Sequence, residues 1–264
     1  MGKGRCVLDV SLVVPEARPI VEAAAQIYLK HLQAGCIGIL VHGSALKGGF
    51  IPGCSDIDFH LYVNGSLVET NGQLPLTVSM AIQRELALVD PAPFQYIQAY
   101  VKSPDVQTAR SAQWVGPIAG SYHMIYGRLP VPEATAEQVI QSSMRTLERI
   151  PMAIGGTSED LISTGGGRLE RRVRYMCTEV WPTLYSVLAL QAPEPLSVWR
   201  LPKDSALHLL AGHTPMGRAI RRFHQCVMEY YSQPHRLEQA LTVLETGVTF
   251  LQAAYDWYEG YRGE

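Results

Sequence analysis

Apolar and polar residues in the first half of the chain follow two different periods, which together predict an α/β structure. Residues 16–34 carry apolar side chains at helical spacing and stop at Gly35, whereas the apolar run 36–41 is typical of a short buried strand. The same criteria predict a second strand, a helix, a third strand and a short fourth strand, over residues 56–63, 77–89, 94–101 and 123–126. We therefore expect a small mixed sheet with helices.

Beyond Pro130 the strand patterns mostly disappear and helical spacing dominates. We expect five helices there, over residues 133–150, 168–190, 203–211, 215–231 and 235–260, with a loop at Gly165-Gly166-Gly167. The change in pattern predicts two domains, an α/β domain over residues 1–130 and an all-α helical bundle over residues 131–264.

Composition restricts the partners of this protein. With 47% hydrophobic and 17% charged residues, the chain is globular and not intrinsically disordered. The formal net charge is −2, which disfavours a nucleic-acid partner because nucleic-acid-binding domains are usually basic. A small-molecule acceptor is the better expectation.

Several features favour a cytoplasmic location. Glu16 and Arg18 interrupt the first apolar stretch, so no signal peptide is expected, and no apolar run approaches the roughly 20 residues of a membrane span. The cysteines show no zinc-ligand spacing and are expected to be buried thiols in a reducing compartment: Cys6, Cys36, Cys54, Cys177 and Cys226.

The segment 42–59 carries the clearest chemical signal. A predicted strand ends at Gly43-Ser44, where small residues allow backbone N–H groups to approach a phosphate closely. A Gly-rich loop follows and leads to Asp56 and Asp58, which are two positions apart on the next predicted strand and so share one face. Two neighbouring carboxylates repel each other unless a cation lies between them, and Mg²⁺ commonly shares such oxygen ligands with substrate phosphates. This combination is typical of phosphoryl-transfer chemistry.

The segment resembles the signature of the DNA polymerase beta-like nucleotidyltransferase superfamily. Within it, the chain is similar to the aminoglycoside nucleotidyltransferases of the streptomycin/spectinomycin adenylyltransferase type. The pattern of that family is Gly-Ser, a Gly-containing loop and Ser-Asp-x-Asp, matched by Gly43, Ser44, Gly49, Ser55, Asp56 and Asp58. The resemblance implies that Gly43, Ser44 and Ser55 bind the nucleotide and that Asp56 and Asp58 hold Mg²⁺ and take part in catalysis.

Weaker similarity extends into the second half. The segment Pro202-Lys203-Asp204 resembles a segment of those adenylyltransferases in which the lysine approaches the triphosphate, so Lys203 is a candidate nucleotide contact. An arginine that the family places on the preceding helix is missing, because Glu179 falls near that position. Arg172 and Arg174 are candidate substitutes.

One departure from the family concerns the catalytic base. The resemblance implies a third carboxylate on the strand 94–101, where Gln98 aligns best and Gln95 is the other candidate. An amide cannot accept a proton at neutral pH, although its oxygen can still weakly ligate a metal. Two explanations stay open: the protein works without this base, or Gln98 is an engineered replacement of a Glu or Asp. His60, on the same strand face as the aspartates, is the next candidate base.

The resulting expectation is an Mg²⁺-dependent enzyme that transfers AMP from ATP to a hydroxyl of a small acceptor, with an aminoglycoside and antibiotic resistance as one possibility. Such polycationic acceptors require an acidic pocket, for which Glu170, Glu179 and Glu229 are candidates, and the acceptor is expected to bind mostly to the second domain. Two alternatives remain. One is a nucleotide-binding module whose catalysis is impaired, and the other is a nucleotidyltransferase that acts on a protein or tRNA through a local basic patch such as 168–174 or 218–222.

Overall fold

The computed structural model describes residues 7–104, 115–163, 168–233 and 236–263. The chain divides into two compact units, residues 1–134 and 135–264. The predicted glycine loop at 165–167, Cys6 and the beginning of the predicted helix 235–260 lie outside the described residues.

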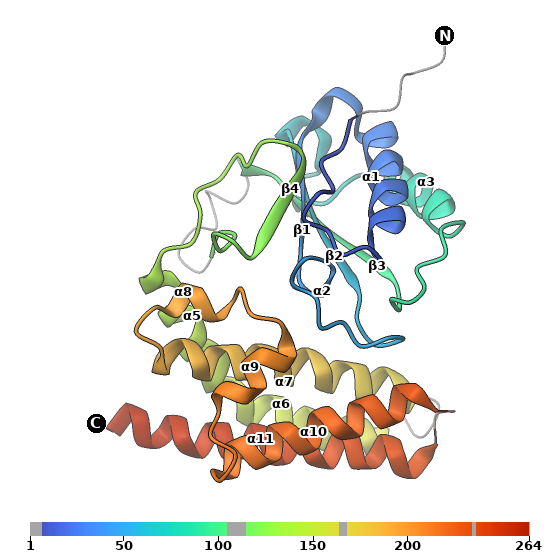
Figure 1. The fold of residues 1–264 in the computed structure, drawn as a ribbon. Coiled ribbons are helices and arrows are strands. Elements are labelled where there is room, and N and C mark those ends of the chain that lie inside the picture. Colours follow the sequence, from blue (N-terminus) through green and yellow to red (C-terminus); the bar gives the residue numbers. More distant parts are fainter. Residues whose placement is uncertain (1–6, 105–114, 164–167, 234–235, 264) are drawn as a thin grey trace. The chain divides into compact units, whose positions relative to one another are not determined.

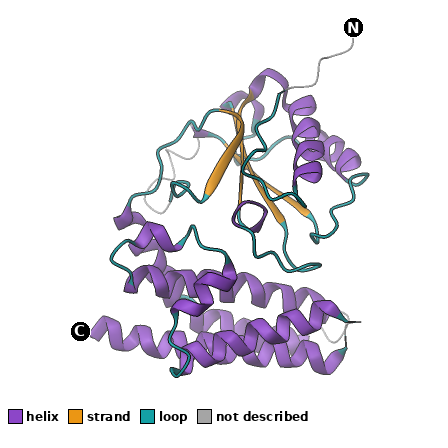
Figure 2. Ribbon diagram, viewed as in Figure 1, coloured by secondary structure: helices purple, strands orange, loops and turns teal. Residues whose placement is uncertain are grey.

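The first unit contains a mixed four-stranded sheet with helices, as the sequence predicts (Figures 1 and 2). In chain order its elements are α1 (Arg18–Leu32), β1 (Cys36–His42), α2 (Ser44–Lys47), β2 (Ile57–Val63), α3 (Leu76–Leu86), β3 (Ile97–Lys102) and β4 (Tyr122–Gly127). The strand order is β3-β2-β1-β4, in which β1 runs antiparallel to β2 and β4 while β2 and β3 are parallel. Parallel pairing requires a long crossover, and this connection contains α3.

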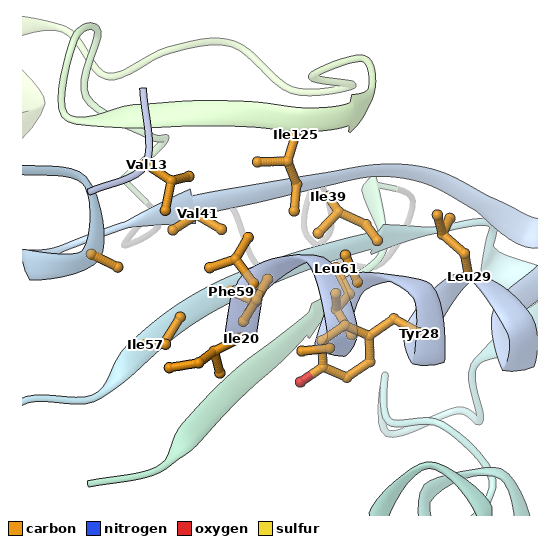
Figure 3. Packing of buried hydrophobic residues seen from close by; sticks show 14 of the residues in the cluster. Val13, Ile20, Tyr28, Leu29, Ile39, Val41, Ile57, Phe59, Leu61 and Ile125 are labelled. Carbon is orange, nitrogen blue, oxygen red and sulfur yellow. The ribbon is translucent and has the colours of Figure 1, made fainter. Parts of the chain in front are cut away.

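The core of this unit lies between α1 and one face of the sheet. Alternate residues of β1 and β2 point toward the helix, and Phe59 and Leu61 are almost completely buried there. Figure 3 shows Tyr28 of α1 directed into the same cluster, where its ring meets that of Phe59 at a centroid distance of 5.4 Å. The opposite face of the sheet therefore carries the other alternate set, which includes His42, Asp58 and His60.

The second unit consists of helices, as the pattern beyond residue 130 predicts (Figure 2). Its elements are α5 (Ala136–Glu148), α6 (Ile150–Ser163), α7 (Leu169–Gln191), α8 (Pro195–Val198), α9 (Lys203–Leu209), α10 (Pro215–Ser232) and α11 (Leu237–Gly263). The long helix α7 packs against α5 and α11, and α11 packs against α10. None of the helices in the part of the chain that the structure describes combines the length and apolarity needed to cross a membrane.

Two sequence expectations need correction here. Helix α5 corresponds to the predicted helix 133–150, but a further helix that was not predicted, α6, follows it and continues to Ser163 despite Gly155 and Gly156. Glycine disfavours helix, but α6 is fixed by tertiary contacts: Arg172 of α7 donates to Thr157 and Asp160 of this helix.

The boundary between the units also lies later than the predicted position 130. The Ala134 amide donates to the Pro117 carbonyl at 3.0 Å, which ties the chain before residue 135 to the first unit. Thr135 then begins α5 with a capping box, in which its side chain accepts from the Gln138 amide while Gln138 accepts from the Thr135 amide.

Candidate functional site

The predicted site residues of the first unit gather at one end of the sheet. Strand β1 ends at His42, α2 begins directly after Gly43, and β2 begins directly after Asp56. In the strand register Asp58 lies opposite His42 on one side and opposite Gln98 on the other. Residues opposite each other on neighbouring strands have Cβ atoms about 5 Å apart. The three side chains thus form a row across β1, β2 and β3.

The aspartate on β2 approaches the turn after β1 very closely. A Cβ added at Gly43 would lie 2.8 Å from Oδ2 of Asp58, closer than such atoms can normally approach. Gly43 also has a φ of 73°, in the left-handed region that side-chain-bearing residues rarely adopt. Residue 43 must therefore be glycine for two independent reasons, and one of them is the Asp58 carboxylate itself.

The loop between α2 and β2 is held in place by backbone hydrogen bonds to the chain before β3. The Gly53 amide donates to the Pro93 carbonyl, the Gln95 amide to the Ser55 carbonyl and the Ile57 amide to the Tyr96 carbonyl, at 2.8 to 3.0 Å. These bonds join the start of β2 to the start of β3. They fix Asp56 and Asp58 in position relative to Gln98.

Ser55, predicted as a nucleotide contact, has a role inside this loop. Its side chain is 3% exposed, and its hydroxyl accepts a hydrogen bond from the Ile51 amide at 2.9 Å. Ser44 is also buried, at 8% exposure, as the first residue of α2. Ser55 thus stabilises the loop that carries the site, and the turn at Gly43 lies close to Asp58.

Gln98 and Tyr100 form a pair beside the aspartates. Nε2 of Gln98 donates to the Tyr100 hydroxyl at 2.6 Å. Burial raises the pKa of Tyr100, and the negative charges of Asp58 and then Asp56 raise it further. The phenol therefore keeps its proton and lies within the electrostatic field of both carboxylates. Because its oxygen already accepts from Gln98, its own hydrogen is available for donation.

Two histidines contact each other on this face of the sheet: His42, which belongs to the row, and His60, which follows Asp58 on β2. The rings of His42 and His60 meet edge to face with centroids 4.6 Å apart, and His60 also contacts the Tyr100 ring at 5.9 Å. Nε2 of His42 and Nδ1 of His60 are buried and have no hydrogen-bond partner among the described residues. Burial lowers the pKa of His42 to about 4, helped by the charges of Lys47 and Lys102. Burial, then His42 and Lys102, lowers the pKa of His60 to about 3.

Both histidines are therefore neutral at pH 7, and both lie in a polar but dry part of the sheet face. Lys102 of β3 lies next to these residues, and its Nζ is 5.7 Å from the centre of the Tyr100 ring. Burial lowers the pKa of Lys102 as well. The cation and the two aspartates together give the face charges of both signs.

The donor set suits a divalent metal only in part. Asp56 and Asp58 supply hard oxygen ligands next to a turn that has no side chain, which matches the preference of Mg²⁺ for carboxylates shared with phosphate oxygens. Among the residues that the structure describes, no group of three or more His, Cys, Asp or Glu side chains is arranged to hold a metal. Further ligands would have to come from a substrate and from water.

Sequence reasoning did not find all residues of this site. It singled out Gly43, Ser44, Asp56, Asp58 and Gln98, and the structure brings them together. It gave no role to His42 or to Tyr100. The alternation of β3, which places Tyr100 beside Gln98 on one face, was the available signal for the tyrosine.

The remaining predicted residues belong to the helical unit. Lys203 begins α9, and its Nζ lies 5.5 Å from the centre of the Trp181 ring of α7. The three glutamates expected to line an acidic pocket, Glu170, Glu179 and Glu229, are exposed on helix surfaces. Glu229 alone borders a described cavity, together with Arg222 and Glu238.

A comparison of the sequence with models of protein families gives no match, and a comparison with characterised proteins gives none either. These comparisons therefore assign the chain to no family.

The contact between Gly43 and Asp58 can be tested with a matched pair of glycines. Gly43 and Gly48 both have positive φ, but a Cβ at Gly48 meets nothing within 4 Å. Alanine at either position should cost about 1 kcal/mol in backbone strain. Gly43→Ala should cost roughly 1 kcal/mol more, since its Cβ must displace the Asp58 carboxylate. The free energies of unfolding in urea measure both effects, and equal losses would contradict the close approach.

The buried histidine pair makes stability depend on pH. The folded chain keeps His42 and His60 neutral below pH 6.5, where the unfolded chain takes up protons. Stability is therefore complete above pH 6.5 and decreases as the pH falls toward 4. Between pH 6.5 and 5 the loss is at most about 2 kcal/mol for each histidine. His60→Leu should remove about half of this decrease in urea unfolding measured at pH 7 and pH 5. An unchanged decrease in the variant would show that the pair does not titrate in this way.

Proposed function

We propose that this protein is a nucleotidyltransferase that moves AMP from ATP to a hydroxyl group of a small acceptor. The observation that carries the proposal is the position of the Asp58 carboxylate, held against the side-chain-free turn at Gly43 and in register with Gln98. A turn without side chains admits a phosphate group to the backbone, and the neighbouring carboxylates supply the ligands of its metal. The resemblance of segment 42–59 to the polymerase beta-like superfamily supports the same proposal.

In this proposal Asp56 and Asp58 hold Mg²⁺, which neutralises charge on the triphosphate. Gly43 and Ser44 provide the turn against which the phosphates lie. The acceptor oxygen attacks the α-phosphorus, the bond to the leaving pyrophosphate breaks, and the acceptor hydroxyl loses its proton.

The group that accepts the proton is the open part of this scheme. Gln98 cannot accept it, and its amide is already used in the bond to Tyr100. His60 is neutral at pH 7, but its burial makes protonation costly. Tyr100 can donate a hydrogen bond to a carboxylate or phosphate oxygen next to the reaction centre. It thereby helps to orient charged groups without itself serving as the base.

A second function follows from the same observation about Gln98. Without a third carboxylate in the described part of the site, the chain would bind Mg²⁺ and ATP but transfer nucleotide slowly or not at all. The intact pair Asp56 and Asp58 is our reason for preferring the enzyme, since two adjacent carboxylates repel each other unless a cation lies between them.

Pyrophosphate release tests the proposed reaction. The protein should release pyrophosphate from ATP when Mg²⁺ and a suitable hydroxyl acceptor are present, and chelation of the metal should stop the release. Asp58→Asn should abolish the reaction while the fold persists. Glu69→Gln, which removes one exposed negative charge from the same unit, should leave the rate unchanged. Release that survives in Asp58→Asn would exclude the metal site, and no release with any of a broad set of acceptors would favour the binding module.

Restoring a carboxylate at position 98 tests the role of that position. Gln98→Glu places a proton acceptor directly opposite Asp58 in the register. If the missing base limits the rate, transfer should increase by about 10²–10⁴-fold while the affinity for ATP changes little. Gln83→Glu on the exposed face of α3 is the control and should have no effect. A rate that does not change in Gln98→Glu means that another group accepts the proton.

A further inference from the structure

The helical unit contains a cluster of arginines that the proposed reaction does not use. Arg168, Arg171 and Arg172 line one cavity of about 140 Å³ together with Tyr175 and Asp160. Arg171, Arg172 and Tyr175 come from the first two turns of α7, Arg168 directly precedes this helix, and the aspartate comes from α6. Three positive charges face one negative charge in this cavity. It is large enough to hold several water molecules, and hence a small anion.

Two of the guanidinium groups are fixed in advance. Nε and Nη2 of Arg171 both donate to the Tyr175 hydroxyl, at 2.8 and 2.5 Å, and the guanidinium lies 5.0 Å from the centre of the same ring. Arg172 donates through Nη1 to Asp160 at 2.8 Å and through Nη2 to Thr157 at 2.5 Å. Arginines on exposed helix faces usually sample many rotamers, so a ligand that binds these two loses less conformational entropy.

Donor capacity remains after these internal bonds are counted. Nε of Arg172 is buried and has no hydrogen-bond partner among the described residues. A guanidinium offers five N–H donors, so Arg171 also keeps donors that its bonds to Tyr175 do not use. The one carboxylate in the cavity, Asp160, already accepts from Arg172. The remaining positive charge and the remaining donors call for an oxyanion.

We propose that this pocket, formed by Arg168, Arg171, Arg172 and Tyr175, binds a phosphate group. Guanidinium groups match the geometry of phosphate oxygens and bind them with two parallel hydrogen bonds. The pocket therefore selects ligands that carry a phosphate and disfavours polycations. If the chain is a nucleotidyltransferase, a phosphorylated acceptor would suit this pocket better than a polycationic aminoglycoside.

Calorimetric titration of the full chain with inorganic phosphate tests the pocket without any transfer assay. We expect saturable binding that weakens as salt is added, because the attraction is electrostatic. Arg171→Gln and Arg168→Gln should each bind phosphate about tenfold more weakly, and both replaced side chains are exposed, so the fold should persist. Arg149→Gln, which removes an exposed arginine of the same unit outside the pocket, should bind as the parent does.

The source of the phosphate is resolved by two further titrations. Glucose 6-phosphate that binds like inorganic phosphate, and loses affinity in Arg171→Gln, supports a phosphorylated acceptor, with glucose as the negative control. Displacement of phosphate by ATP, again sensitive to Arg171→Gln, supports the pocket with the nucleotide as the source. No phosphate binding to the parent, or an equal loss in Arg149→Gln, overturns the proposal. Because no transfer is measured, either result is independent of the outcome for the reaction itself.

Discussion

The Asp58 carboxylate occupies its place only because residue 43 has no side chain. Gly43 ends β1 in a left-handed conformation, and the space that a Cβ would fill is taken by Oδ2 of Asp58 from the neighbouring strand. Antiparallel pairing of β1 with β2 brings these two residues together, and parallel pairing of β2 with β3 places Gln98 opposite Asp58 and Tyr100 opposite His60. The sheet thus places the Asp58 carboxylate against a glycine turn and opposite Gln98.

The burial of polar side chains on one face of the sheet reduces the stability of the fold. His42 and His60 are buried as neutral rings with nitrogen atoms that lack partners in the described part of the chain, and a buried polar group without a hydrogen bond typically costs about 1–3 kcal/mol. Lys102 is partly desolvated on the same face. Polar groups that reduce stability in this way are most often retained at functional sites. The opposite face of β1 and β2, packed on α1, carries the buried apolar set that includes Ile39, Phe59 and Leu61 (Figure 3).

Much of the fold could be predicted from residue patterns, and the errors have physical causes. A continuous apolar run located β1 and period-2 alternation located β2 to within a residue, and helical spacing located α7 and α10 equally well. Helix α6 was missed because Gly155 and Gly156 lower its intrinsic propensity, while Arg172, far away in the sequence, holds it in place. Four of the cysteines, Cys36, Cys54, Cys177 and Cys226, are free and buried, as expected for thiols in a core.

The sequence predicts which residues of the site share a face of one strand, but it does not predict how neighbouring strands bring these residues together. Spacing put Asp56 and Asp58 on one face, but the register that places Asp58 between His42 and Gln98 depends on which strands pair and in which direction. The internal use of the Ser55 hydroxyl, which accepts from Ile51, is a property of the folded loop. The basic segment 168–174 is visible in the sequence, but the placement of Asp160 of α6 beside these arginines is not. In each case the sequence did not show which residues of different segments become neighbours in the folded chain.

Binding of Mn²⁺ in place of Mg²⁺, followed by electron paramagnetic resonance, tests the central claim most directly. The claim is that the Asp58 carboxylate, held against Gly43, forms a site for a divalent metal together with a nucleotide. The parent protein should bind Mn²⁺ more tightly when ATP is present, and Asp58→Asn should lose this effect while its unfolding free energy stays close to that of the parent. If folded Asp58→Asn binds Mn²⁺ and ATP as tightly as the parent does, the carboxylate at Gly43 is not the metal site.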